Sequence, residues 1–240
     1  MADMVKAEPA PGYPPEEGCY LRGNDYSPVA VVVILRWARE ETPEDIEHLV
    51  RVGLESGAAL SGTLQTENIG LEKVICNVVS NPNIRYLIVC GPESPGHLVG
   101  ESIAALMKNG LDDRKRIVGT SAPTPYLYNI PAEYVERFRK QVALVNLTNE
   151  GSPDVLRQAV WSCYQEDPTA FRSDLLQDPG AYPEPPLDGK ITWRIREPYK
   201  EPRDEEERRH LRKAEALVER IRKSVEARRH ERGGREPQAT

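Results

Sequence analysis

One histidine in the middle of the chain has the surroundings of a metal ligand. His97 lies in a glycine- and proline-rich loop that joins a buried apolar segment to a helical one. At the start of a helix the positive end of the helix dipole disfavours an imidazolium, and a metal needs the neutral ring. Glu101 follows one turn later, where a carboxylate can accept a hydrogen bond from the second ring nitrogen and fix its tautomer. The other interpretation is that His97 only caps the helix or fills the loop.

A lone histidine restricts the kind of metal that it could hold. Zinc sites take three or four protein ligands, and no other His or Cys stands near His97 at zinc-ligand spacing. Cobalt in a corrin ring needs one protein ligand, because the ring supplies the equatorial nitrogens. The segment His97 to Gly100 keeps the His-x-x-Gly half of the cobalamin-binding motif Asp-x-His-x-x-Gly, with Pro95 in the place of the aspartate.

The elements around His97 alternate between strands and helices. Continuous β-branched runs predict buried strands at Val29–Leu35 and Ile84–Cys90. Apolar residues at helical spacing, with their capping residues and stops, predict helices over Pro43–Gly57, Thr66–Asn81, His97–Asn109, Pro131–Gln141 and Ser152–Asp167, and shorter strands at Arg116–Gly119 and Val142–Leu147. This order predicts an α/β fold, a Rossmann-like three-layer domain with a mostly parallel sheet. Ligands of such sheets bind beyond the carboxyl ends of the strands, which is where the loop after Cys90 lies.

Prolines and charges divide the rest of the chain. We expect a flexible N-terminal arm at 1–19, the α/β domain at 20–171, a proline-rich linker at 172–200 and a charged C-terminal helix at 201–240. Lys190–Arg196 alternates as an edge strand would. Apolar residues of the tail at coiled-coil spacing predict oligomerisation through 211–225: Leu211, Ala214, Val218, Ile221 and Val225. A solvated helix with a weak apolar stripe is the alternative.

Composition excludes several classes of protein. The net charge of −6 over 240 residues disfavours non-specific binding of nucleic acid. The longest apolar run, Val29–Leu35, is far shorter than the roughly 20 residues of a membrane-spanning helix. The first fifteen residues do not read as a secretory signal, and the four cysteines form no Cys-x-x-Cys pair. We therefore expect a cytoplasmic protein with reduced thiols and no membrane span.

Several longer stretches resemble the A subunit of tetrahydromethanopterin S-methyltransferase. The resemblance covers about Tyr20 to Phe171. It is carried by Tyr26–Val31, Thr66–Lys73, Ser80–Gly91, Gly96-His97, Asn129–Pro131, Glu136–Phe138 and Val145–Leu147. It implies an α/β domain that binds a corrinoid, cobalamin or a related cobamide, with His97 matching the lower axial ligand of cobalt.

The resemblance also implies a role in methanogenesis. The chain would be the corrinoid subunit of a methyltransferase, acting with partner subunits of a sodium-pumping membrane complex. In that family the corrinoid takes a methyl group from N5-methyl-tetrahydromethanopterin and passes it to coenzyme M, cycling between cob(I)amide and methyl-cob(III)amide. His97 is then expected to bind cobalt in the methylated state and to leave it in the reduced state.

Two loops are expected to contact the corrinoid around His97. Their residues are Gly91, Pro92, Glu93, Ser94, Gly96, Gly100 and Glu101 in the first loop, and Thr66, Glu67 and Asn68 in the second. The sequence departs from the family where Glu101 replaces a common Gln, where Leu64 and Gln65 replace Cys and Lys, and where a charged tail replaces a membrane anchor. The alternative function is an α/β interaction protein or small-molecule-binding protein that has lost the corrinoid.

Overall fold

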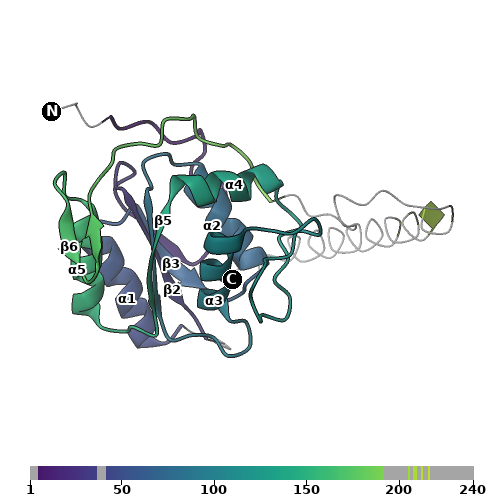
Figure 1. The fold of residues 1–240 in the computed structure, drawn as a ribbon, viewed down its shortest axis with the longest axis horizontal. Coiled ribbons are helices and arrows are strands. Elements are labelled where there is room, and N and C mark those ends of the chain that lie inside the picture. The colour runs from purple at the N-terminus through teal and green to yellow at the C-terminus, as the bar shows by residue number, and fades with distance from the viewer. Residues whose placement is uncertain are drawn as a thin grey trace, which may run out of the picture. The chain divides into compact units, whose positions relative to one another are not determined.

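The computed structural model describes residues 5–36 and 42–191, and single residues of the C-terminal segment (Glu205, Arg208, Arg209, Arg212 and Ala216). The chain divides into two units, Met1–Thr192 and Trp193–Thr240. The first unit is an α/β domain with helices on both faces of a central sheet (Figure 1). The predicted three-layer, Rossmann-like fold is confirmed.

The central sheet has the strand order β1-β3-β2-β4-β5. The strands are β1 (Tyr20–Arg22), β2 (Val29–Ile34), β3 (Leu60–Leu64), β4 (Tyr86–Gly91) and β5 (Ala143–Thr148). All neighbours pair in parallel except β1, which lies antiparallel to β3 at the edge. Strands β2 and β4 are buried along their whole length, as their continuous apolar sequences predict. A separate hairpin pairs β6 (Thr169–Phe171) with β7 (Asp174–Leu176).

Five helices cover the two faces of the sheet (Figure 1). They are α1 (Glu44–Glu55), α2 (Ile69–Val79), α3 (Val99–Asn109), α4 (Ala132–Gln141) and α5 (Pro153–Cys163). Alternate residues of β2 separate two cores: Val32 faces the core of α2, α3 and α4, whereas Val31 faces the core of α1 and α5. Among the helices that the structure describes, none combines the length and the apolar sequence needed to cross a membrane.

The segments at the two ends of the first unit pack on the domain. Residues 5–19 were expected to be a flexible arm, but Tyr13 is buried in the core of α2 and α3. The side-chain amide oxygen of Asn77 accepts a hydrogen bond from the backbone of Glu16, and that of Asn83 accepts one from Ala7. From the proline-rich linker, the ring of Tyr182 makes cation–π contacts with the guanidinium groups of Arg85 and Arg137. These extended segments are therefore attached to the domain by side-chain amides and arginines rather than by strand pairing.

Other expectations about local structure differ from the result. Residues 116–119 form only isolated bridges, Leu111 with Ile117 and Arg116 with Tyr126, and add no strand to the sheet. Strand β3 was not predicted, because its central Ser61-Gly62-Thr63 lacks the apolar residues of a buried strand. Of the predicted edge strand at Lys190–Arg196, the structure describes only the first two residues, and they form no strand. The apolar residues of the predicted helix interface at 211–225 lie outside the described part of the chain.

Candidate functional site

His97 lies at the position in the sheet where α/β domains bind ligands. The chain crosses from β2 to β3 on one side and then returns to β4 on the other side of β2, so the direction of the crossovers reverses at β2. The carboxyl ends of β2 and β4 therefore flank a topological switch point. The loop with His97 leaves β4 at this edge, and Arg36 at the end of β2 donates a hydrogen bond to the carbonyl of Glu93 in that loop, at 3.1 Å.

The His97 loop is fixed by the start of helix α3. The Glu93 carboxylate accepts hydrogen bonds from the backbone N–H groups of Gly100 and Glu101, at 3.1 and 2.9 Å, and so satisfies free donors of the first helical turn. The carbonyl of Ser94 accepts from the N–H groups of His97 and Leu98. The carboxylate of Glu93, a residue expected to contact the corrinoid, caps α3 in this structure.

A buried carboxylate orients the His97 ring. Nδ1 of His97 lies 2.7 Å from Oε2 of Glu67, which precedes helix α2. The Glu67 side chain is fully buried, whereas 38% of the His97 side chain is exposed. A carboxylate can only accept here, so Nδ1 carries a proton, and in the neutral form of the ring Nε2 has the lone pair that a ligand site needs.

The second oxygen of Glu67 is held from the loop between α3 and α4. Oε1 accepts hydrogen bonds from the backbone N–H and the hydroxyl of Thr124, at 3.0 and 2.8 Å. Burial alone raises the pKa of the Glu67 carboxyl, but hydrogen bonds from its own backbone N–H, from Thr124 and from His97 outweigh burial and lower that pKa below its ordinary value. Glu67 is therefore an anion at neutral pH.

Glu101 does not pair with His97, which corrects the expectation from sequence. Its Oε1 accepts instead from the N–H of Ser121 at 2.5 Å and from the hydroxyl of Thr120 at 3.2 Å. Spacing of one helical turn brings two side chains together only when both residues are helical, but α3 begins at Val99 and Leu98 has left-handed backbone angles (φ 47°, ψ 51°). This turn takes His97 off the helix face on which Glu101 lies.

The other residues of this loop that were expected to contact the corrinoid differ in their surroundings. A Cβ on Gly100 would lie 2.5 Å from Oγ1 of Thr148, so packing requires glycine there. Gly91 has a positive φ of 87°, so its backbone conformation favours glycine. A Cβ on Gly96 would meet nothing within 4 Å, so the loop is open beside His97. Ser94 is buried and Pro92 is partly buried in the loop.

The residues on either side of Glu67 begin helix α2 and line a pocket. Oδ1 of Asn68 accepts from the N–H of Ile69, and Oγ1 of Thr66 accepts from the N–H of Gly70. Thr66 and Asn68 also line a pocket of about 410 Å³ between β1, the end of β3 and the start of α2. Glu67 lies between them in sequence but does not line the pocket, and its side chain contacts His97 instead.

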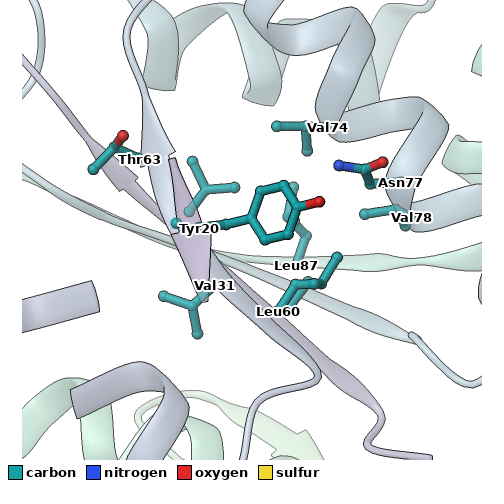
Figure 2. A pocket seen from close by; sticks show the side chains of 11 residues that line it. Tyr20, Val31, Leu60, Thr63, Val74, Asn77, Val78 and Leu87 are labelled. Atoms are coloured by element: carbon teal, nitrogen blue, oxygen red, sulfur yellow. The ribbon is translucent and has the colours of Figure 1, made fainter. Parts of the chain in front are cut away.

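A smaller, half-open pocket of about 60 Å³ shares Tyr20 and Asn77 with the first one. Figure 2 shows the ring of Tyr20 pointing from β1 toward α2, close to Val74 and Asn77. Its walls are mostly apolar side chains of β2, β3, β4 and α2. This cavity is a packing gap that is too small for a cofactor.

The side chains around His97 suit a metal that is already bound in a macrocyclic ligand. No group of three or more His, Cys, Asp and Glu side chains suited to a metal ion occurs among the residues that the structure describes. His97 thus presents a single imidazole nitrogen with a carboxylate behind the ring. That arrangement does not complete a zinc site, and a single imidazole could serve only a metal whose other ligands come from a bound group such as a corrin ring.

Comparison with known proteins identifies the family. The model of the family of tetrahydromethanopterin S-methyltransferase A subunits matches residues 6–179. The first of two A subunits of this enzyme from Methanothermobacter thermautotrophicus is 42% identical over 174 residues, which are 72% of this chain and 68% of the relative. The second A subunit from the same organism is 39% identical over 72% of this chain and 90% of its own length. The A subunit from Methanocaldococcus jannaschii is 39% identical over 70% of this chain and 66% of its own length. The chain belongs to the family of tetrahydromethanopterin S-methyltransferase A subunits.

Proposed function

We propose that this chain carries a corrinoid and serves as the corrinoid subunit of a methyltransferase, with His97 as the protein ligand of cobalt. The observation that carries the proposal is the His97–Glu67 pair: a partly exposed ring whose Nδ1 is bound at 2.7 Å to a buried carboxylate. A carboxylate behind a metal-bound histidine raises the basicity of the ligand and fixes its orientation. Helix capping alone gives no reason to bury a glutamate behind the ring.

The residues around His97 have separate roles in this proposal. Nε2 of His97 would be the nitrogen that binds cobalt, and Glu67 would keep the proton on Nδ1. The loop is open at Gly96, next to His97 in sequence, and would leave room for the corrinoid there. The polar side chains of Thr66 and Asn68, on either side of Glu67 in sequence, would contact amides of the corrinoid. When bound, a corrinoid supplies a cobalt centre that accepts and donates a methyl group, and the protein contributes the ligand and the position.

Because the chain belongs to this family, the proposal extends to substrates and partners. The relatives are named as subunits of tetrahydromethanopterin S-methyltransferase. We propose by analogy that this chain works with partner subunits, that the methyl donor is methylated tetrahydromethanopterin and that the acceptor is the thiol of coenzyme M. The identity of about 40% along most of the domain supports this extension.

The proposal is tested by adding cobalamin to the purified protein and recording the visible spectrum. The wild-type protein should retain cobalamin through gel filtration, with the absorbance of a histidine-ligated corrinoid. The variant His97→Ala should lose that absorbance. The matched control is His48→Ala, because His48 is an exposed histidine of helix α1, which packs on the opposite face of the sheet from α3.

Two results would contradict the proposal. If wild-type protein does not retain cobalamin, the chain is an α/β interaction or small-molecule-binding protein without a corrinoid. If His97→Ala binds cobalamin with an unchanged spectrum, the corrinoid is held elsewhere and His97 is not its ligand.

A further inference from the structure

The Glu67 carboxylate is shared between His97 and a loop that is distant in sequence. One oxygen faces Nδ1 of His97, and the other accepts two hydrogen bonds from Thr124, which lies 57 residues from Glu67. Thr124 belongs to the loop of residues 110–131 between helices α3 and α4. The hydroxyl of Thr124 also accepts a hydrogen bond from Nδ2 of Asn68, at 3.1 Å. The four side chains therefore form a chain of contacts from Asn68 through Thr124 and Glu67 to His97.

The exposure of these residues indicates what Thr124 does. Glu67 is fully buried, although both His97 and Thr124, which contact its two oxygens, are solvent-accessible. Thr124 therefore lies between Glu67 and solvent. Water that reached Oε1 would compete for the lone pairs, and the carboxyl could turn away from Nδ1.

We propose that Thr124 is a positioning residue for His97: its hydroxyl holds the Glu67 carboxylate in the orientation that keeps the proton on Nδ1 and leaves Nε2 free for a ligand. The inference deepens the proposed function and rests on it where the ligand is concerned. Thr124 has no contact with His97 itself among those the structure gives, so it acts through Glu67.

The same loop offers a matched control, because another carboxylate holds it in a similar way. The Glu72 carboxylate accepts from the backbone N–H and the side-chain amide of Asn129, at 2.7 and 2.8 Å. This contact anchors the loop but does not involve His97. A variant at Asn129 therefore measures the effect of a weaker loop anchor alone.

The test compares Thr124→Val, Thr124→Ser and Asn129→Leu. Valine keeps the shape and the backbone N–H of Thr124 and removes only the hydroxyl, while serine restores the hydroxyl. Because Thr124 is exposed, these changes should leave the fold intact, and Thr124→Ala serves in the same comparison if the valine variant does not fold. The first readout is the ring ¹⁵N chemical shifts of His97 in cobalamin-free protein, assigned with His97→Ala, which report the tautomer. The second is the affinity for added cobalamin.

The wild-type protein and Thr124→Ser should show the proton on Nδ1, and so should Asn129→Leu. Thr124→Val should show a mixture of tautomers and about tenfold weaker cobalamin binding, at the lower end of the range for groups behind a metal ligand. The proposal is overturned if Thr124→Val keeps the wild-type tautomer, or if Asn129→Leu changes it as much.

The two proposals fail in distinguishable ways. A tautomer that responds to Thr124 in a protein that binds no cobalamin would support the positioning role and contradict the proposed function. A protein that binds cobalamin through His97, with a tautomer that does not respond to Thr124, would contradict the positioning role and leave the proposed function standing.

Discussion

Replacing Glu67 with glutamine should change the tautomer of His97 and weaken the binding of cobalamin. The carboxylate accepts one hydrogen bond from His97 and two from Thr124, besides the one from its own backbone N–H. A glutamine offers one acceptor oxygen and one amide nitrogen. Its oxygen should face the two donors of Thr124, so its amide would donate to Nδ1 of His97. The ring would then carry its proton on Nε2, where the metal has to bind.

The size of the effect follows from the bonds that change. A hydrogen bond to a charged group contributes about 1.5–3 kcal/mol, and Glu67→Gln removes the one that holds His97. Partners of metal-bound histidines change metal affinity by about 10–100-fold, which is about 1.4–2.7 kcal/mol. The two ranges agree, so we expect a loss of cobalamin affinity between about 10- and 100-fold.

The assay is a titration of protein with cobalamin, followed by visible absorbance, with Glu101→Gln as the control. Glu101 bonds to Ser121 and Thr120, so its variant should bind cobalamin within about twofold of the wild-type protein. Equal losses in the two variants, or wild-type affinity in Glu67→Gln, would refute the assignment of Glu67 as the partner of His97.

Three further predictions concern packing, thiols and pH. Gly100→Ala should destabilise the protein by about 1–3 kcal/mol in urea unfolding, because its Cβ would overlap Thr148 and displace the Glu93 cap, whereas Gly96→Ala should be nearly neutral. A thiol reagent should label only Cys19 in the native protein, since the other three cysteines are buried and burial raises their pKa to about 12; a second fast thiol contradicts this. Burial raises the pKa of the Glu72 carboxyl in the folded protein, despite hydrogen bonds from Asn129. The stability that the protonated carboxyl contributes is therefore full below its unfolded pKa of about 4.3 and is lost as pH rises through the higher pKa of the folded state. Between about pH 4 and about pH 7, the urea midpoint of wild type should therefore decrease relative to that of Glu72→Gln, which has no carboxyl at this position. The same pH dependence in both proteins would refute the argument.

The sequence predicts the inner part of the fold better than its edges. Strands β2 and β4 are apolar throughout because both faces are covered, and this pattern is visible without a structure. Strand β3 can pair with β1 because Gly62 leaves room for Tyr20. A Cβ on residue 62 would lie 2.4 Å from the Cβ of Tyr20. A pairing that depends on contact between distant residues leaves no periodic signal, so β1 and β3 were not predicted.

The site shows the same division between local and distant information. The residue types of its loop were enough to select His97. Helical spacing indicates Glu101 as its partner, because the sequence does not predict a left-handed backbone at Leu98, where there is no glycine. Glu67 reaches His97 because the carboxyl ends of parallel strands share one edge of the sheet, and Thr124 arrives from a loop without regular structure.

The measurement that tests the central claim most directly is electron paramagnetic resonance of the protein with cobalamin in the cobalt(II) state, after labelling its histidines with ¹⁵N. An axial nitrogen splits each cobalt hyperfine line of the signal, into three lines when it is ¹⁴N and into two when it is ¹⁵N. If His97 binds cobalt, the labelled protein should show two-line splitting, and unlabelled protein should show three. Three-line splitting in the labelled protein, or two-line splitting that persists in labelled His97→Ala, would contradict His97 as the ligand.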